Sequence, residues 1–507
     1  MADYDLAIIG GGLNGVCMAR DAAGRGLRVV LIEQGDLGSG HSASMGLMQG
    51  HFTGIERGAL LGISRLLAER GKWLNNAPHL VRPLQMTMPA HDDHRPPWMI
   101  RSMLQIYDRL SPRQGLPRSA SLDVTHHEAG VPLKRPFGLA FAWSECVADI
   151  SRLLVLAAVD AAERGATVMT GARCVRADRT DIWRLALVNR GRRTSLTARA
   201  LANAAGAWIP SVAETVLRIA APPMKLMVSS QIVLKRRFDH HGVYAFQNND
   251  RELIYAAPWH GDFTIVGNAE RPFTGDPAIV SASAEDVNHL CRATGRYFRE
   301  PVEAVDVVHL QSALYPAGLR GGDGGIGTVR FDAGRKAAPL LTVFGGDATM
   351  SRRRAEMAVS RLTPFYPMSR PWTATAPLPG GDFPWDRLGD QIERAQERWP
   401  FLDARQAARL VAAYGTRLEV ILGAARSRDD LGPRFGPDLT AAEARYLMTN
   451  EWARFPEDIL WRRSKLGLSM SRESCEALAR FMTTAAEPQP YLSSTANACV
   501  ERSVFRS

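Results

Sequence analysis

The sequence predicts an α/β + α fold class: a Rossmann-type dinucleotide-binding domain, an inserted antiparallel β-sheet domain and a C-terminal α-helical domain. Three observations predict it. A glycine-rich turn follows an apolar run at the N-terminus, two later apolar runs also end at glycine, and only helical patterns follow position 385. At 507 residues the chain is also too long for a single hydrophobic core, so two or three domains are expected.

The N-terminal segment has the order strand, turn, helix, strand. An apolar strand over residues 6–9 leads into a glycine run that begins at Gly10. Gly10 permits the tight turn, Gly12 lets backbone approach a pyrophosphate, and Gly15 lets the following helix pack on the strand. Glu33 ends the next apolar run, where a carboxylate accepts hydrogen bonds from ribose hydroxyls. This order predicts a dinucleotide site; the alternative is a glycine-rich structural turn.

Two later strands also stop at glycine. The strand over residues 198–205 ends at Gly206, and the strand over 338–344 ends before Gly346 and Asp347. A strand that stops at glycine before a helix is a place where backbone meets a cofactor. Asp347 there is suited to a contact with a bound cofactor, and it is equally suited to capping the helix that follows.

The dinucleotide-binding domain is expected to be discontinuous, with the substrate domain inserted into it. The expected bounds are 1–75, 148–215 and 330–376 for the dinucleotide-binding domain, 76–147 and 216–329 for the substrate domain, and 385–507 for the helical domain. A Pro/Gly-rich stretch before position 385 predicts the linker.

Composition narrows the function classes. The formal net charge is +10, but Lys and Arg are spread without a nucleic-acid-binding motif, so no nucleic-acid partner is expected. The six cysteines contain no CxxC pair, which predicts free thiols, a reducing compartment and no metal site. No signal-peptide pattern is seen, and no apolar run approaches the about 18 residues that cross a bilayer, so a cytoplasmic protein is expected.

One stretch suits contact with an anionic membrane. An apolar, helix-like run between Trp98 and Leu110 is flanked by basic residues. These are Arg82, Arg95, Arg101, Arg109 and Arg113. Such an amphipathic helix predicts a peripheral place on the cytoplasmic membrane. The alternative is a helix that packs on the substrate domain.

Beyond the opening fingerprint, the chain resembles the FAD-dependent, aerobic glycerol-3-phosphate dehydrogenases nearly from end to end. The stretches that carry the resemblance include 77–80 (APHL), 97–101 (PWMIR), 203–208 (NAAGAW), 338–346 (APLLTVFGG) and 458–467 (DILWRRSKLG). The resemblance implies FAD in a glutathione-reductase-like domain, an alcohol such as sn-glycerol 3-phosphate as substrate, and electrons passed to a membrane quinone. Further cofactor contacts are expected from Ser42, Ser44, Cys174, Gly206, Gly346, Asp347 and Thr349. A homodimer is a further expectation.

The sequence departs from this family where the substrate would bind. Family Lys, His, Arg and Tyr residues are replaced by Gly46, Gln49, Thr53 and Gly54, a family Arg by Tyr315, a family Lys by Asp347, and a Lys-Gly-Ser-His segment by Val228-Ser229-Ser230-Gln231. A charge-assisted hydrogen bond contributes roughly 1.5–3 kcal/mol, so losing three weakens phosphate binding by on the order of 5–9 kcal/mol. Other arginines, such as Arg330 or Arg352, would have to replace them.

Two interpretations of these departures stay open. Because the FAD fingerprint and the helical domain are kept, an active flavoenzyme is favoured, with sn-glycerol 3-phosphate or a less anionic alcohol or amine as its substrate. The alternative is a catalytically silent homologue that binds flavin. Oxidation of an alcohol needs a base for the hydroxyl proton. His51, Tyr315 and His260 are the candidates for catalytic or substrate contacts, and the alternative for each is a structural side chain.

Overall fold

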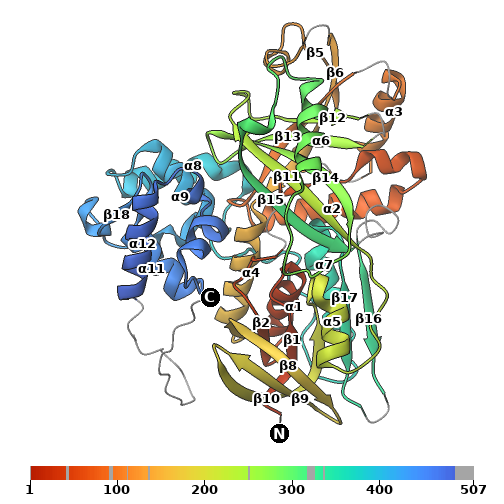
Figure 1. The fold of residues 1–507 in the computed structure, drawn as a ribbon, viewed down its shortest axis with the longest axis vertical. Helices are drawn as coiled ribbons and strands as arrows, with labels where there is room; N and C mark the ends of the chain where they lie inside the picture. Colours follow the sequence, from red (N-terminus) through yellow and green to blue (C-terminus); the bar gives the residue numbers. More distant parts are fainter. Residues whose placement is uncertain are drawn as a thin grey trace.

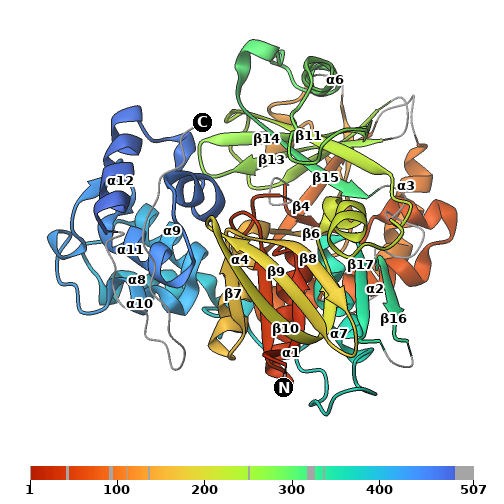
Figure 2. The ribbon, with the colours of Figure 1, turned by 60° about the horizontal axis from the view of Figure 1, so that its bottom comes forward.

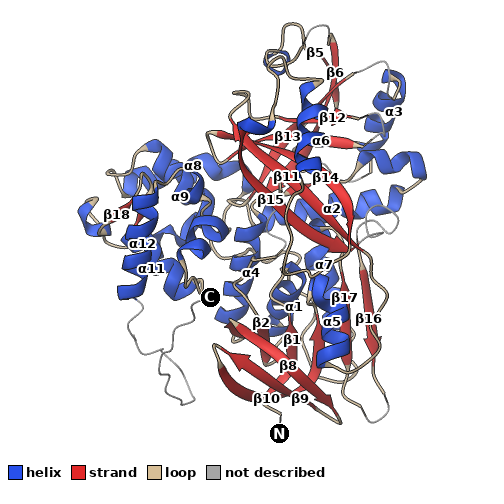
Figure 3. Ribbon diagram, in the orientation of Figure 1, coloured by secondary structure: helices blue, strands red, loops and turns tan. Residues whose placement is uncertain are grey.

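A computed structural model shows two β-sheets and a helical domain (Figure 1). The residues that it describes are 2–40, 45–90, 95–110, 112, 114–134, 137–248, 252–316, 326–334 and 337–485. Figure 3 shows the strands gathered in two layers, with the C-terminal domain almost entirely helical. The predicted fold class is confirmed.

The first sheet has eight strands and lies at the bottom of Figure 1. Its main path runs β16-β17-β10-β1-β2-β7. The bounds are β1 Tyr4–Ile9, β2 Val29–Glu33, β7 Thr167–Thr170, β8 Ala172–Arg179, β9 Trp183–Asn189, β10 Arg192–Asn203, β16 Thr328–Asp332 and β17 Leu340–Phe344. Strands β17, β10, β1, β2 and β7 pair in parallel, whereas β16, β9 and β8 pair antiparallel. The parallel strands therefore end at one common edge, where Rossmann-type folds bind dinucleotides.

Alternation along β1 explains how both faces of this sheet are covered. Leu6 and Ile8 pack on a core that also contains residues of the helices α1 (Leu13–Gly24), α4 (Ile150–Glu163) and α7 (Ser351–Ser360). Ala7 and Ile9 point to the opposite face and pack against the β8–β9 meander. Because both faces are buried, β1 is apolar throughout its central part.

The second sheet has nine strands, in the order β15-β11-β14-β13-β12-β4-β6-β3, with β5 beside β6. The bounds are β3 Leu47–Met48, β4 Val81–Pro89, β5 Ala120–Asp123, β6 Leu139–Ala148, β11 Leu226–Lys235, β12 Val243–Gln247, β13 Leu253–Trp259, β14 Phe263–Phe273 and β15 Val307–Pro316. All its pairs are antiparallel except β12 with β4. The predicted inserted antiparallel sheet is therefore present.

Helices cover both faces of the second sheet. Helix α6 (Ala284–Gly295) packs on one face. The 3₁₀ helix η1 (Phe52–Arg57) and helices α2 (Leu60–Asn76) and α3 (Pro97–Tyr107) pack on the other. The expected domain bounds stay a prediction, and one detail differs from them: β3 belongs to this second sheet although residues 1–75 were expected to serve the dinucleotide-binding domain.

The C-terminal domain has its own hydrophobic core. Its main helices are α8 Leu388–Arg398, α9 Ala404–Tyr414, α10 Leu418–Leu422, α11 Ala441–Asn450 and α12 Arg472–Ala485, with a π-helical turn η10 Asp458–Arg463. A short hairpin, β18 Arg434–Phe435 with β19 Leu439–Thr440, adds to the predicted helices. Figure 2 shows this domain beside α4, at one side of both sheets.

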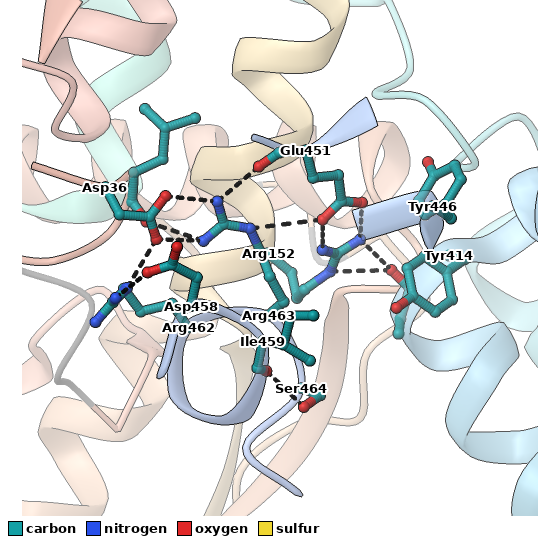
Figure 4. Close-up of polar contacts among 12 residues, drawn as sticks. Asp36, Arg152, Tyr414, Tyr446, Glu451, Asp458, Ile459, Arg462, Arg463 and Ser464 are labelled. Atoms are coloured by element: carbon teal, nitrogen blue, oxygen red, sulfur yellow. Dashed lines mark hydrogen bonds and ion pairs between the residues drawn. The ribbon is translucent and has the colours of Figure 1, made fainter. Parts of the chain in front are cut away.

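Buried ion pairs join the C-terminal domain to the first sheet (Figure 4). Arg463 donates to both carboxylate oxygens of Asp36, each at 2.8 Å, and Arg462 donates to the same carboxylate at 2.7 Å. Arg152 of α4 pairs with Glu451 of the C-terminal domain. The second sheet is joined as well, because His309 of β15 stacks on Trp461 with ring centroids 4.6 Å apart.

Candidate active site

The glycine turn after β1 has the geometry that a pyrophosphate needs. Gly10 has φ 108°, and a Cβ there would lie 2.5 Å from the carbonyl oxygen of Ala204. A Cβ on Gly15 would lie 1.8 Å from the oxygen of Gly10, so both positions require glycine for packing. Gly12 differs, because a Cβ there would meet no described atom within 4 Å. The space in front of Gly12, at the N-terminus of α1, fits a phosphate group.

Glu33 is held rigidly at the end of β2. Its two carboxylate oxygens accept hydrogen bonds from the backbone N–H groups of Gly11 (2.7 Å) and Gly35 (2.8 Å). Burial raises the pKa of Glu33, while these two N–H groups oppose that shift. Each oxygen keeps a second lone pair, so Glu33 can still accept hydrogen bonds from ribose hydroxyls.

Arg354 fixes the turn that follows β17, and the sequence alone did not single it out. Its buried guanidinium donates to the backbone oxygens of Asp347 (2.9 Å) and Ile326 and to the side chain of Asn14 in α1. Gly346 has φ 94°, and a Cβ there would lie 2.0 Å from Arg354 Nη2. Arg354 therefore connects the β17 turn to the start of α1, across the predicted cofactor site.

His51 and Asp347 form a hydrogen-bonded pair between the two sheets. His51 Nε2 lies 3.1 Å from Asp347 Oδ2, and the two side chains are 32% and 17% exposed. Burial alone would raise the pKa of Asp347, but hydrogen bonds from His51 and Thr349 lower it to about 2. Asp347 also accepts a hydrogen bond from the backbone N–H of Thr349 (2.8 Å), so it caps the short helix after β17 as well.

A buried polar cluster holds the segment before His51. The hydroxyl of Tyr107 accepts the N–H of Gly50 at 2.9 Å and donates to Glu145. Glu145 is also paired with Arg70. A Cβ on Gly50 would lie 2.5 Å from the Tyr107 oxygen, so this contact requires glycine. The backbone of His51 itself is left-handed, with φ 57°. This support was not visible in the sequence, because its members are far apart along the chain.

Tyr315 lies near the end of β15, on the face of the second sheet that is opposite to α6. Ser312 contacts Ser230, and Ser230 donates to Asp286 of α6 at 2.8 Å, so these residues define the α6 face. Three residues beyond Ser312, the side chain of Tyr315 points to the other face. His51 precedes η1, which packs on that same face. The placement agrees with a role for Tyr315 near His51, and that role stays a prediction.

His260 lies elsewhere. It is exposed in the turn between β13 and β14. The charged residues that interact electrostatically with the His260 side chain are Asp149, Lys465 and Arg82. The neighbouring Asp262 lies 3.6 Å from Arg405 of the C-terminal domain. No hydrogen bond or ion pair among the described residues joins His260 to the His51–Asp347 pair. The geometry therefore gives no support to a catalytic His260.

The remaining predicted cofactor residues differ in what the structure says of them. Ser42 and Ser44 lie outside the described residues. Gly206 has φ 58° at the end of β10, and a Cβ there would meet no described atom within 4 Å. Thr349 is fully buried. Cys174 is buried in the meander core, and burial raises the pKa of its thiol to about 12, so only its backbone is suited to a cofactor contact.

The two arginines named as replacements for the family's basic residues lie in different surroundings. Arg352 is buried and bonded to both carboxylate oxygens of Glu69, at 2.8 and 2.9 Å. Arg330 is exposed on β16, with its guanidinium 5.0 Å from the ring centroid of Phe344. Within the described part of the chain, no group of His, Cys, Asp and Glu is arranged to hold a metal ion.

Comparison with known proteins decides the family. Residues 5–349 match the family model described as FAD dependent oxidoreductase, and residues 371–490 match the C-terminal domain of alpha-glycerophosphate oxidase. The chain belongs to the FAD-dependent oxidoreductases. The protein is therefore an FAD-dependent dehydrogenase, and the predicted cofactor is confirmed. The open space at Gly12 suits the FAD pyrophosphate, and contact of Gly12 with the cofactor stays a prediction.

Relatives of this oxidoreductase span nearly its whole length. The glycerol-3-phosphate dehydrogenase of Pseudomonas aeruginosa is 39% identical, covering 94% of this chain and 95% of the relative. The D-erythritol 1-phosphate dehydrogenase of Brucella abortus is 34% identical, with 95% and 98% covered. The structure of the glycerol-3-phosphate dehydrogenase from Bacillus halodurans, complexed with FAD, covers 95% of this chain and 94% of that chain, with a TM-score of 0.71 and 19% identity. The predicted resemblance to glycerol-3-phosphate dehydrogenases is confirmed.

Proposed function

We propose that this protein oxidises an alcohol with His51 as the acceptor of the hydroxyl proton. The observation that carries the proposal is the His51–Asp347 pair, with His51 Nε2 3.1 Å from Asp347 Oδ2, just beyond the end of β17. Asp347 engages Nε2, so the tautomer with a proton on Nε2 donates to Asp347 and leaves Nδ1 as the acceptor. A carboxylate that orients a histidine in this way is a recurring arrangement for a general base.

The reaction balances with these groups. Bound FAD supplies a hydride acceptor with two-electron capacity. His51 takes the proton from the substrate oxygen as the carbon–hydrogen bond breaks, so the carbon–oxygen single bond becomes a carbonyl. Asp347 stays ionised, because its pKa is held at about 2, and it stabilises the imidazolium that forms. Tyr107 keeps Gly50, and with it His51, in place during this step.

The phosphate esters of the relatives fit this site poorly. Gly46, Tyr315 and Asp347 stand where the family has Lys, Arg and Lys. None of the three supplies positive charge, and Asp347 adds a negative one beside the proposed substrate position. We therefore expect sn-glycerol 3-phosphate to be a weak substrate, and an alcohol without a phosphate, or an amine that pairs with Asp347, to be preferred.

The acceptor of the electrons is proposed to be a membrane quinone, reached by peripheral contact with the cytoplasmic membrane. Large apolar side chains are exposed where α2 and α3 begin and on α3 itself: Leu60 (40%), Leu61 (75%), Trp98 (71%) and Ile106 (42%). Arg101 on the same helix is exposed as well. Among the described residues no helix is long and apolar enough to span a bilayer. The choice of quinone follows from the family resemblance, and a homodimer stays a prediction.

Anaerobic reduction of the flavin tests the proton acceptor. Wild type and His51→Ala are mixed with a panel of alcohols, and bleaching of the flavin absorbance is followed. We expect His51→Ala to retain FAD and to be reduced about 10²- to 10⁴-fold more slowly, the usual contribution of a general base. The matched control is His289→Ala, which changes a histidine of α6 on the far side of the sheet. Reduction of His51→Ala at the wild-type rate would refute the proposal, and no reduction of wild type by any alcohol or amine would favour a silent homologue.

A further inference from the structure

A row of polar side chains crosses the second sheet on the face opposite to α6. The strand register aligns Gln311 of β15 with Gln231 of β11, Gln231 with Gly267 of β14, and Gly267 with Tyr255 of β13. Because directly opposed residues of antiparallel strands project to the same face, the three side chains lie on one face, with Gly267 between Gln231 and Tyr255. A row of amides and a phenol is unusual on a sheet face whose neighbouring positions, such as Ile265, are apolar and fully buried.

A β-bulge completes the row. The register between β11 and β14 shifts between Ser230 and Gln231, so Asn268 is the extra residue of β14. Gln231 Nε2 donates to Asn268 Oδ1 at 2.7 Å, and Gln231 Oε1 accepts from Gln311 Nε2 at 3.1 Å. A Cβ on Gly267 would lie 2.5 Å from Cγ of Gln231, so glycine leaves room for this side chain. Bulges beside active sites commonly aim a side chain in this way.

The other end of the row reaches the segment that precedes the proposed catalytic histidine. The hydroxyl of Tyr255 donates to Gln49 Oε1 at 3.3 Å. Gln49 precedes His51 by two residues, in the segment that the buried Tyr107 holds. We call Gln311, Gln231, Asn268, Tyr255 and Gln49 the amide row. It joins the edge strand β15, where Tyr315 lies, to the segment of the His51–Asp347 pair.

Two members of the amide row replace charged or titratable family residues. Gln49 and Gln231 each stand where the resembling family has His. The structure brings these two replacements onto one face, with Gly267 and Tyr255 between them. The row therefore has hydrogen-bond donors and acceptors but no formal charge. Gln231 is only 2% exposed, so its remaining donor and acceptor capacity is directed within the protein or to a bound molecule.

We propose that the amide row binds the hydroxyl groups of an uncharged polyol whose terminal or secondary alcohol is oxidised at His51. Amides and hydroxyls both donate and accept, so they match vicinal hydroxyls one for one. A phosphate dianion in the same place would lose its hydration without gaining a cation, which is costly in a buried site. The inference rests on the proposed function for the oxidation itself, and it adds the substrate class and the residues that select it.

Binding to a catalytically impaired protein tests the row separately from the chemistry. Glycerol and erythritol, and the phosphate ester of each, are titrated into FAD-loaded His51→Ala, and perturbation of the flavin spectrum reports binding. Gln231→Met is then added, because methionine keeps the length of the side chain without its hydrogen bonds. The matched control is Gln85→Met, an exposed glutamine of β4 in the same sheet. Flavin content and thermal midpoint are recorded for each variant, and Gln311→Met, which alters a less buried position, replaces Gln231→Met if that variant does not fold.

We expect the free polyols to bind at least about 10-fold more tightly than their phosphate esters. Gln231→Met should weaken polyol binding by about 10-fold to 100-fold, the loss for one or two buried hydrogen bonds, while Gln85→Met leaves it unchanged. Tighter binding of the esters, or polyol binding unaffected by both Gln231→Met and Gln311→Met, overturns the inference. Neither result depends on whether His51 is the proton acceptor, which the rate of flavin reduction decides.

Discussion

Two polar regions of this molecule differ in charge: one consists of buried ion pairs and the other of neutral amides. The contact between the C-terminal domain and the first sheet is built from fully charged, buried pairs such as Arg463 with Asp36 and Arg152 with Glu451 (Figure 4). The face that would receive the substrate holds neutral amides, and the family's basic residues are absent from it. In the first region each charge finds its partner within the chain. On the substrate face, the partner of a basic side chain would be the phosphate of the substrate. A substrate without a phosphate would leave such a side chain without a partner.

The position of Asp36 connects the first region to the predicted cofactor site. Asp36 follows Glu33 and Gly35, whose carboxylate and N–H form the predicted ribose site. Arg462 and Arg463 therefore hold the loop that carries this site against the C-terminal domain. We expect these pairs around η10 to support cofactor binding by holding the loop in position. Substitutions in the cofactor half and in the substrate face should therefore have different effects.

Gly12→Val should abolish FAD binding, because the side chain would fill the open space for the pyrophosphate. The purified variant should be colourless and fail to take up added FAD. Gly138→Val is the control, since Gly138 is exposed and also has open space around it. A yellow Gly12→Val protein with normal flavin content would place the cofactor elsewhere.

Arg463→Met should destabilise the protein by about 3 kcal/mol, the lower end of the range for a broken buried pair, because Arg462 still faces Asp36. Denaturant unfolding of the FAD-loaded protein measures this. Arg472→Met is the matched control: Arg472 is 92% exposed and pairs with Glu476 on the surface, so little change is expected. Equal effects of the two changes would mean that the buried pairs do not join the domains.

Asp347→Asn should make the free energy of unfolding less dependent on pH in the acid range. The pKa of Asp347 is lowered to about 2 in the folded protein, so its contribution is present above the ordinary carboxyl range and is lost as the pH falls towards 2. The lowered pKa contributes up to about 2 kcal/mol to the free energy of unfolding. Unfolding measured between about pH 5 and pH 3 should show a steeper fall for wild type than for Asp347→Asn. Parallel curves would show that the His51 contact does not stabilise the carboxylate.

Tyr107→Phe should lower the rate of flavin reduction by about 10-fold, the effect of one hydrogen bond, and leave FAD content unchanged. Phenylalanine removes the hydroxyl that accepts the N–H of Gly50, so His51 is held less firmly. A positioning role predicts that the pH profile of the reduction rate also shifts, because the orientation of His51 changes. A changed thermal midpoint with an unchanged rate and profile would indicate a structural role only.

Local patterns allowed part of this structure to be predicted. The turn at Gly10, Gly12 and Gly15 and the strand ends at Gly206 and Gly346 consist of neighbouring residues, whose backbone requirements can be recognised in one sequence. His51 and Asp347 were both expected near the flavin, but their contact spans 296 positions, and no local pattern encodes it. Arg354, Tyr107 and Gln231 were not assigned roles, because their partners come from strands and helices that only the tertiary fold brings together.

The most direct test of the central claim is the specificity ratio of the wild-type enzyme. Anaerobic flavin reduction is measured with a free polyol and with its phosphate ester, and kcat/KM is compared for the two. The altered substrate face predicts a ratio above one in favour of the polyol, with slow reduction by sn-glycerol 3-phosphate. A kcat/KM for sn-glycerol 3-phosphate at about 10⁴ M⁻¹s⁻¹ or above, within the typical range for enzymes, would contradict the account. It would show that the phosphate is still bound by residues other than those that the family uses.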